Sequence, residues 1–206
     1  FVLNNNESRK TLHKNLEFTA TEQYKLLRTN LDFTVPEGEK CPIIGVTSSM
    51  RGEGKSTTAV NLSYVLAASG KKVLLIDGDM RIPSIAKKMD INGDYGLTNY
   101  LMKTELRPLD TLKTDVLDNW YIMPAGELPP NPSELLGSEN MQDFIRQSKE
   151  NYDIIIISAP LTCYLIGKTR GKDRKLIDKL TVSVLCIIGI CHLSLCRSLC
   201  NRKSAV

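Results

Sequence analysis

Continuous apolar runs alternate with segments of helical periodicity through most of the chain. Four of the runs have the length of strands buried on both faces: 41–49, 71–79, 119–127 and 152–158. Helices are predicted over 19–33, 55–70, a short segment that Pro83 and Ser84 open, 96–102 and 131–150. Gly70 is a typical residue to end the second of these helices, and Pro132 is a typical residue near the start of the last one. This alternation predicts an α/β fold: a mostly parallel sheet flanked by helices in three α/β/α layers.

The helix predicted over 19–33 has an apolar side and a charged side. Tyr24, Leu27 and Leu31 recur at helical spacing. The charged residues fall on the other side of the helix: Glu22, Lys25 and Arg28.

The composition changes near residue 160, which divides the chain into a predicted domain, 1–160, and an atypical tail, 161–206. The tail holds nine Lys and Arg against two Asp and Glu, whereas the whole chain has a net charge of only +4. Five of the six cysteines also lie there without CxxC spacing, so incidental thiols are favoured over a metal site or disulfides. The uncharged run from Leu180 to Cys196 is shorter than the roughly 20 residues of a membrane span, and a buried strand or a disordered end is favoured.

A glycine-rich turn between the first strand and the next helix predicts a phosphate site. Backbone N–H groups of such a turn surround a phosphate, and the N-terminus of the helix adds positive potential. Lys55 would reach the β- and γ-oxygens, and the Ser56 hydroxyl would ligate Mg²⁺. Ser49 occupies the place of the first glycine of the usual motif. The predicted phosphate-binding residues are Ser49, Met50, Arg51, Gly52, Glu53, Gly54, Lys55, Ser56 and Thr57.

Two aspartates follow the second strand, at the sheet edge where the phosphate site is expected. Asp77 ends the apolar run and Asp79 lies two residues on, so both can face the phosphate. They can hold Mg²⁺ and its waters, and one can accept a hydroxyl proton. The alternative is a solvated strand end with two capping aspartates.

These segments resemble the bacterial tyrosine kinases of capsule and exopolysaccharide synthesis, which have a P-loop NTPase fold. The resemblance covers about residues 20–160 and includes EQYKLLRTNL, TSSMRGEGKST, VLLIDGDMRIPS, AGELPPNPSELLGS and YDIIII. It implies ATP and Mg²⁺ as cofactors, and phosphoryl transfer to protein tyrosine in the regulation of polysaccharide synthesis and export.

The resemblance also assigns roles to individual residues. Asp77 would help to hold Mg²⁺ with Ser56, and it would activate the attacking tyrosine, with Asp79 beside it. The helix with Glu22, Lys25 and Arg28 would build a ring-shaped homo-oligomer, although Lys25 replaces an arginine and lacks its two-pronged fork. Expected partners are the cytoplasmic tail of a membrane adaptor, which is a polysaccharide co-polymerase, and tyrosine-containing proteins, but not nucleic acid. With no signal-peptide pattern at residues 1–10, a cytoplasmic location at the inner face of the membrane is expected.

Two features of the family are missing after the fourth strand. The third acidic motif has Ser158 in place of its aspartate, and the last tyrosine in the chain is Tyr164. A reading-frame change near codon 158 would explain both, because the shifted frame can encode residues similar to the family's continuation; a divergent tail is the alternative. A sheet ending at this strand is expected to leave the outer edge of the strand unpaired.

Two other functions therefore stay open. One is an impaired or inactive kinase that still binds nucleotide, because Ser158 carries no charge. The other is an ATPase switch of the partition and septum-site type, which Met50 opposes because those proteins have a lysine there.

Overall fold

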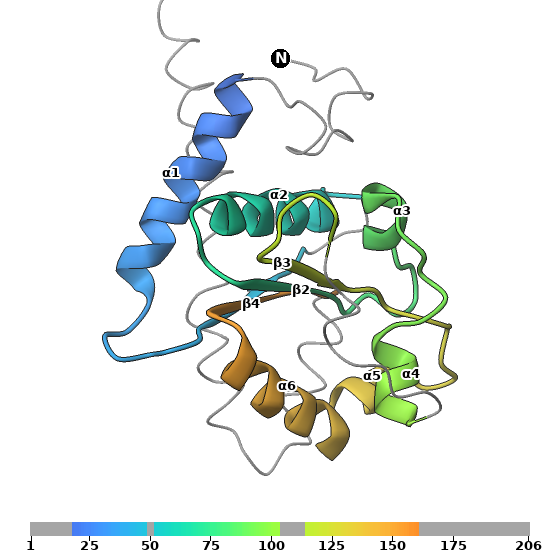
Figure 1. Cartoon of the computed structure of the whole chain (residues 1–206). Helices are drawn as coiled ribbons and strands as arrows, with labels where there is room; N and C mark the ends of the chain where they lie inside the picture. Colours follow the sequence, from blue (N-terminus) through green and yellow to red (C-terminus); the bar gives the residue numbers. More distant parts are fainter. Residues whose placement is uncertain (1–17, 49–51, 104–113, 161–206) are drawn as a thin grey trace, which may run out of the picture.

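A computed structural model describes residues 18–48, 52–103 and 114–160 of the chain. Its helices and strands alternate as the sequence predicts (Figure 1). The elements in chain order are α1 Phe18–Thr34, β1 Ile43–Val46, α2 Lys55–Ala68, β2 Val73–Asp77, α3 Ile85–Met89, α4 Leu97–Met102, β3 Trp120–Met123, α5 Pro132–Leu136, α6 Glu139–Asn151 and β4 Ile154–Ser158. The predicted tail, 161–206, and the hypothesis of a changed reading frame lie outside the described residues.

The described strands form one parallel sheet in the order β1-β4-β2-β3. Strand β4 is central: Ser158 is in register with Val46 of β1 on one side and with Asp77 of β2 on the other. The expectation that β4 would leave an unpaired outer edge is therefore wrong. It assumed that strands add in sequence order, whereas the last described strand inserts between the first and the second.

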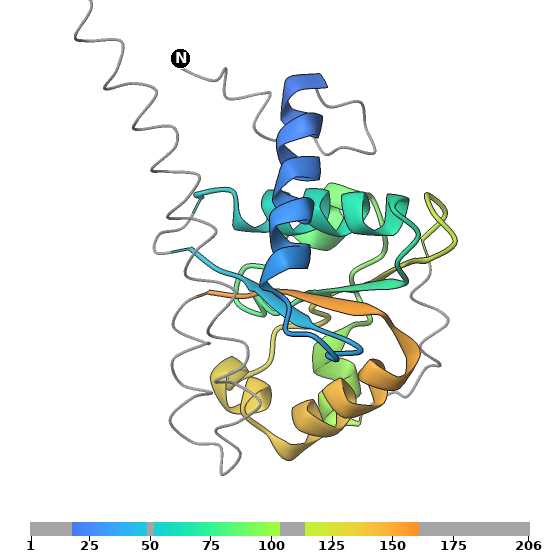
Figure 2. The same cartoon turned by 90° about the vertical axis from the view of Figure 1, so that its left-hand side faces the viewer.

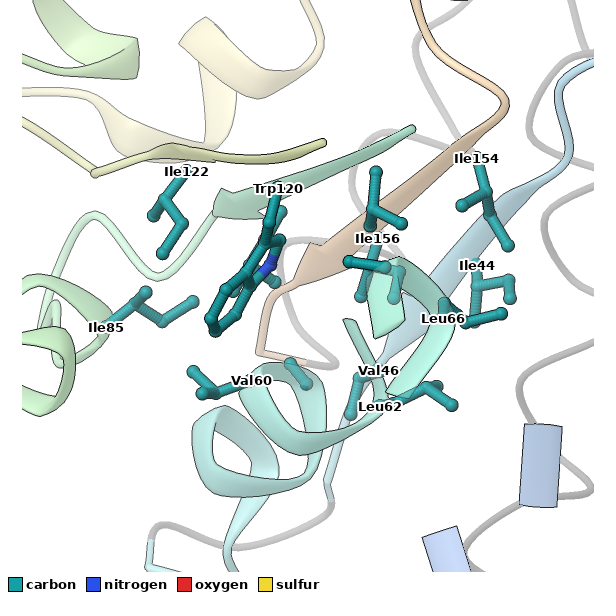
Figure 3. Packing of buried hydrophobic residues seen from close by; sticks show 14 of the residues in the cluster. Ile44, Val46, Val60, Leu62, Leu66, Ile85, Trp120, Ile122, Ile154 and Ile156 are labelled. Carbon is teal, nitrogen blue, oxygen red and sulfur yellow. The ribbon is translucent and has the colours of Figure 1, made fainter. Parts of the chain in front are cut away.

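Helices cover both faces of the sheet, which confirms the three-layer prediction (Figure 1). On one face, alternate strand residues pack against α2; Figure 3 shows Ile44, Ile156 and Trp120 of the sheet near Leu62 and Leu66 of the helix. On the other face, the intervening strand residues pack with α4 and α6 in a second cluster that includes Leu74, Ile155 and Phe144. Because side chains of a strand alternate between its faces, a continuous apolar run supplies both clusters.

The helix predicted over 131–150 is two helices, α5 and α6. Gly137 and Ser138 separate them, and the Ser138 hydroxyl accepts a hydrogen bond from the Met141 N–H at 3.2 Å. Serine is a favourable residue before a helix N-terminus because its oxygen satisfies one of the free N–H groups there. The single-helix prediction missed this internal cap.

Helix α1 lies against α2, and its N-terminal half extends beyond the other described elements (Figure 2). Leu31 is buried and Leu27 packs against the same cluster, as the periodicity predicts. Three large apolar side chains of α1 are exposed: Phe18, Leu26 and Phe33. No helix of the described residues is both long enough and apolar enough to cross a membrane.

Candidate functional site

The candidate site lies at the carboxyl edge of the sheet, where α2 begins. Gly54 precedes α2 with φ 89° and ψ 10°, and Gly52 also has φ 89°. A residue with a side chain rarely adopts these angles, so the two glycines allow the chain to turn sharply into the helix. The buried Ser56 follows in the first turn of α2. Of the predicted phosphate-binding stretch, residues 49–51 lie outside the described residues.

Lys55, the first residue of α2, joins the predicted phosphate-binding turn to the ends of two strands. Its Nζ lies 3.0 Å from Asp79 Oδ2 and donates a long hydrogen bond of 3.5 Å to Ser158 Oγ. Both charged side chains of the ion pair are largely buried, with exposed fractions of 11 % for Lys55 and 16 % for Asp79. Water therefore screens this pair less than it screens a surface ion pair.

Asp77 is fully buried at the end of β2, and backbone N–H groups surround its carboxylate. Its Oδ2 accepts hydrogen bonds from Ser84 at 3.0 Å and Ile85 at 2.9 Å, and its Oδ1 accepts one from Asp79 at 3.2 Å. Burial raises the pKa of the Asp77 carboxyl above its ordinary value of 3.8, while these three hydrogen bonds and the charge of Lys55 oppose the rise. Asp77 thus fixes the loop from β2 to α3.

Asp79 has a similar local role but is more accessible. Its Oδ1 accepts a hydrogen bond from the Ile82 N–H at 3.1 Å, while Oδ2 pairs with Lys55. The alternative interpretation of the two aspartates, as capping groups at a solvated strand end, is thus correct about the capping of backbone N–H groups but not about the solvation of Asp77.

Ser158 lies in the middle of this edge. It is fully buried, in register with Asp77, and its Oγ faces Lys55. The chain beside it is tightly packed, because Gly78 donates a 2.8 Å hydrogen bond to the Ser158 carbonyl, and a Cβ added at Gly78 would come within 3.2 Å of that oxygen. The sequence analysis did not predict the close approach of Gly78 to Ser158. The sequence feature that could have indicated it is the position of a glycine between the two aspartates, Asp77 and Asp79, at the end of a strand.

The structure brings Lys55, Asp77 and Asp79 together, but it places the predicted oligomer residues elsewhere. Glu22 and Lys25 lie on α1 and form an ion pair of 2.8 Å with each other, and Arg28 is half-buried on the same helix. Among the described residues, no group of three His, Cys, Asp or Glu side chains could hold a metal ion.

A family model described as an AAA domain matches residues 41–169, and the chain belongs to this family. A domain of this family with a P-loop is of the nucleotide-binding type. Among proteins of similar sequence, the chain matches bacterial tyrosine kinases. The chain is 37 % identical over 156 residues to tyrosine-protein kinase YwqD of Bacillus subtilis, covering 76 % of this chain and 59 % of the relative. It is also 37 % identical over 124 residues to tyrosine-protein kinase CpsD of Streptococcus pneumoniae serotype 4, covering 60 % of this chain and 54 % of the relative.

Solved structures agree with the sequence comparison. The kinase domain of the Escherichia coli tyrosine kinase ETK superposes with a TM-score of 0.65 at 25 % identity, covering 80 % of this chain and 68 % of that domain. The resemblance to bacterial tyrosine kinases is therefore confirmed. The chain spans only a little over half the length of each of these two curated relatives.

Proposed function

We propose that the chain is an ATP-dependent protein-tyrosine kinase domain that regulates the synthesis and export of capsular or extracellular polysaccharide. One observation carries the proposal: Lys55, Asp77 and Asp79 meet at the end of the phosphate-binding turn, in a chain whose named relatives are tyrosine-protein kinases. The domain responsible is the segment 1–160.

The phosphoryl transfer divides among these residues. The tyrosine oxygen bonds to the γ-phosphorus, the bond from that phosphorus to the β–γ bridging oxygen breaks, and ADP leaves. Backbone N–H groups of residues 52–57 would surround the phosphates, and Lys55 would stabilise charge on the β- and γ-oxygens. Ser56 and Asp77 are the residues that would hold Mg²⁺, which supplies further charge neutralisation at the phosphates.

The phenolic proton passes to a carboxylate of the β2 end. Asp79 is the more accessible acceptor, because it needs only to separate from Lys55. Asp77 is fully buried and both of its oxygens bind N–H groups of residues 79–85, so this loop would have to move before Asp77 met a tyrosine. We therefore assign the proton to the pair, with Asp79 as the member nearer to solvent.

Partners follow from the same proposal. A membrane adaptor would bring the domain to the inner face of the membrane and activate it, and tyrosine-containing proteins would be its substrates. The helix carrying Glu22, Lys25 and Arg28 would form a homo-oligomer. The exposed Phe18, Leu26 and Phe33 on this helix support an association surface, since contact would remove them from water.

The test is a transfer assay with the full chain, ATP, Mg²⁺ and a tyrosine-rich peptide. Mass spectrometry should find phosphotyrosine with the wild-type protein and none with Lys55→Ala. Asp32→Asn serves as a matched control, since Asp32 pairs with Lys71 at 2.6 Å on the exposed surface. Failure to bind ATP at all would overturn the proposal.

The second candidate function is nucleotide binding without efficient transfer. It is favoured by Ser158, an uncharged residue in register with Asp77 and facing Lys55. Loss of one positioned charge at a reacting centre typically lowers a rate by about 100-fold or more. Binding of ATP together with absence of phosphotyrosine on the peptide would establish this candidate instead.

A further inference from the structure

Position 158 is the point where the β-sheet meets the phosphate-binding lysine. The Ser158 side chain lies on the central strand between Val46 and Asp77, is fully buried, and reaches Lys55 at 3.5 Å. Any charge placed there would act directly on Lys55 and on a phosphate that Lys55 holds, with little water between them.

The oxygen atoms at this edge offer little to a divalent cation. Three backbone N–H groups already use the Asp77 carboxylate, and Asp79 is paired with Lys55. Ser158 adds a neutral hydroxyl. Mg²⁺ binds through one or two carboxylates plus phosphate oxygens and water, so Asp77 and the Ser56 hydroxyl can accept it. Among the described residues, however, no cluster of three acidic side chains is present to hold the ion.

The charge at position 158 decides how strongly this edge repels an anion. Lys55 and the N-terminus of α2 supply positive charge, which the carboxylates of Asp77 and Asp79 partly offset. A neutral residue at 158 adds no further repulsion between protein and phosphate. An acid at this position would do the opposite: it would oppose a bare phosphate and attract a metal-bound one.

We propose that Ser158 makes the binding of nucleoside di- and triphosphates at this site largely independent of a divalent cation. The inference rests on nucleotide binding in the proposed function, but not on phosphoryl transfer. Lys55 and the helix N-terminus hold the phosphates, and Mg²⁺ contributes little to their affinity.

The test measures the dissociation constant of ADP by calorimetry, with excess Mg²⁺ and again with EDTA. The wild-type full chain is expected to bind ADP with dissociation constants that agree within about 3-fold in the two conditions. Ser158→Asp is expected to bind about 10- to 100-fold more weakly in EDTA than in Mg²⁺, the range by which one supporting group alters metal affinity. Ser158→Asn, which adds similar volume without charge, should behave as the wild type.

Several outcomes overturn the inference. A wild-type protein that needs Mg²⁺ for more than a tenfold gain in affinity contradicts it, and this comparison requires no variant to fold. Equal Mg²⁺ dependence in Ser158→Asp and Ser158→Asn contradicts it as well, provided that both variants unfold cooperatively. If ADP binds in EDTA but the peptide assay gives no phosphotyrosine, the inference stands while the kinase proposal fails. If ADP binds in neither condition, both fail.

Discussion

Asp79 and a bound phosphate compete for the same lysine, and replacing Asp79 by asparagine tests this competition. The carboxylate lies 3.0 Å from Lys55 Nζ. A phosphate that takes Lys55 must displace this partner. Asp79→Asn removes the negative charge, while its amide oxygen can keep the hydrogen bond from the Ile82 N–H that Oδ1 accepts at 3.1 Å. The variant should therefore bind phosphate more tightly.

The magnitude follows from the burial of the pair. Exposed ion pairs contribute about 0 to 1 kcal/mol, and removing one partner of a fully buried pair costs about 3 to 5 kcal/mol. With exposed fractions of 11 % and 16 %, Lys55 and Asp79 fall between these limits. Allowing for the water that still reaches them, we take about 1 to 2 kcal/mol. At 1.4 kcal/mol for each factor of ten, ADP should bind about 5- to 30-fold more tightly.

The assay is ADP calorimetry in EDTA, so that any contact of Asp79 with a metal cannot offset the effect. Thermal unfolding without nucleotide should show a less stable variant, because Lys55 has lost its carboxylate partner, and a larger gain in melting temperature with ADP. Asp32→Asn, which breaks an exposed pair with Lys71, should leave the ADP affinity unchanged. Unchanged or weaker ADP binding by Asp79→Asn would refute the competition.

Three further predictions concern stability and reactivity. Gly96→Ala should lower the free energy of unfolding by about 1 to 3 kcal/mol in urea titrations, because its Cβ would lie 2.3 Å from the backbone nitrogen of Gly126. Gly137→Ala, with 3.6 Å to its nearest neighbour, should change the free energy of unfolding far less, and equal losses would contradict the packing argument. Asn119→Ala should cost about 1 to 2 kcal/mol in the same titration, since the Asn119 amide donates hydrogen bonds of 2.7 Å to the Ala67 carbonyl in α2 and 2.8 Å to the Lys71 carbonyl just after the helix. An unchanged midpoint would show that water replaces these hydrogen bonds. Burial raises the pKa of the Cys41 thiol to about 11, so in the native protein at pH 8 only roughly one thiol in a thousand is the reactive thiolate. Peptide mapping after alkylation should find Cys41 unmodified until denaturant is added or the pH approaches 11, and rapid labelling at pH 8 would contradict the burial.

The strand and helix alternation was predictable because buried parallel strands need apolar residues on both faces. Strand β2 is buried along its whole length, and its sequence VLLID is correspondingly continuous in apolar residues up to Asp77. The internal cap at Ser138 was harder to predict, because serine also occurs within helices. The central position of β4 could not be predicted from the sequence, since the order in which strands pair depends on contacts between distant segments.

The same distinction holds at the site. Lys55 and Asp79 belong to segments with recognisable spacing, and the rule that ligands bind at the carboxyl ends of parallel strands brings them to one edge. The hydrogen bonds that occupy Asp77 could not be foreseen, because their donors at Ser84 and Ile85 are backbone groups that any residue supplies. Sequence patterns show side chains, and the partners that restrain Asp77 are in the main chain.

The central place of β4 has a consequence for how the protein forms during synthesis. Ile43 of β1 pairs with Ile155 of β4, so the first strand has no sheet partner among the described residues until the last one has left the ribosome. Strands β2 and β3 can meet earlier, since they pair directly. Bringing such distant segments together is entropically costly and slows folding. We therefore expect β1 to wait, with apolar surface exposed, for a strand that also carries Ser158 into the phosphate site.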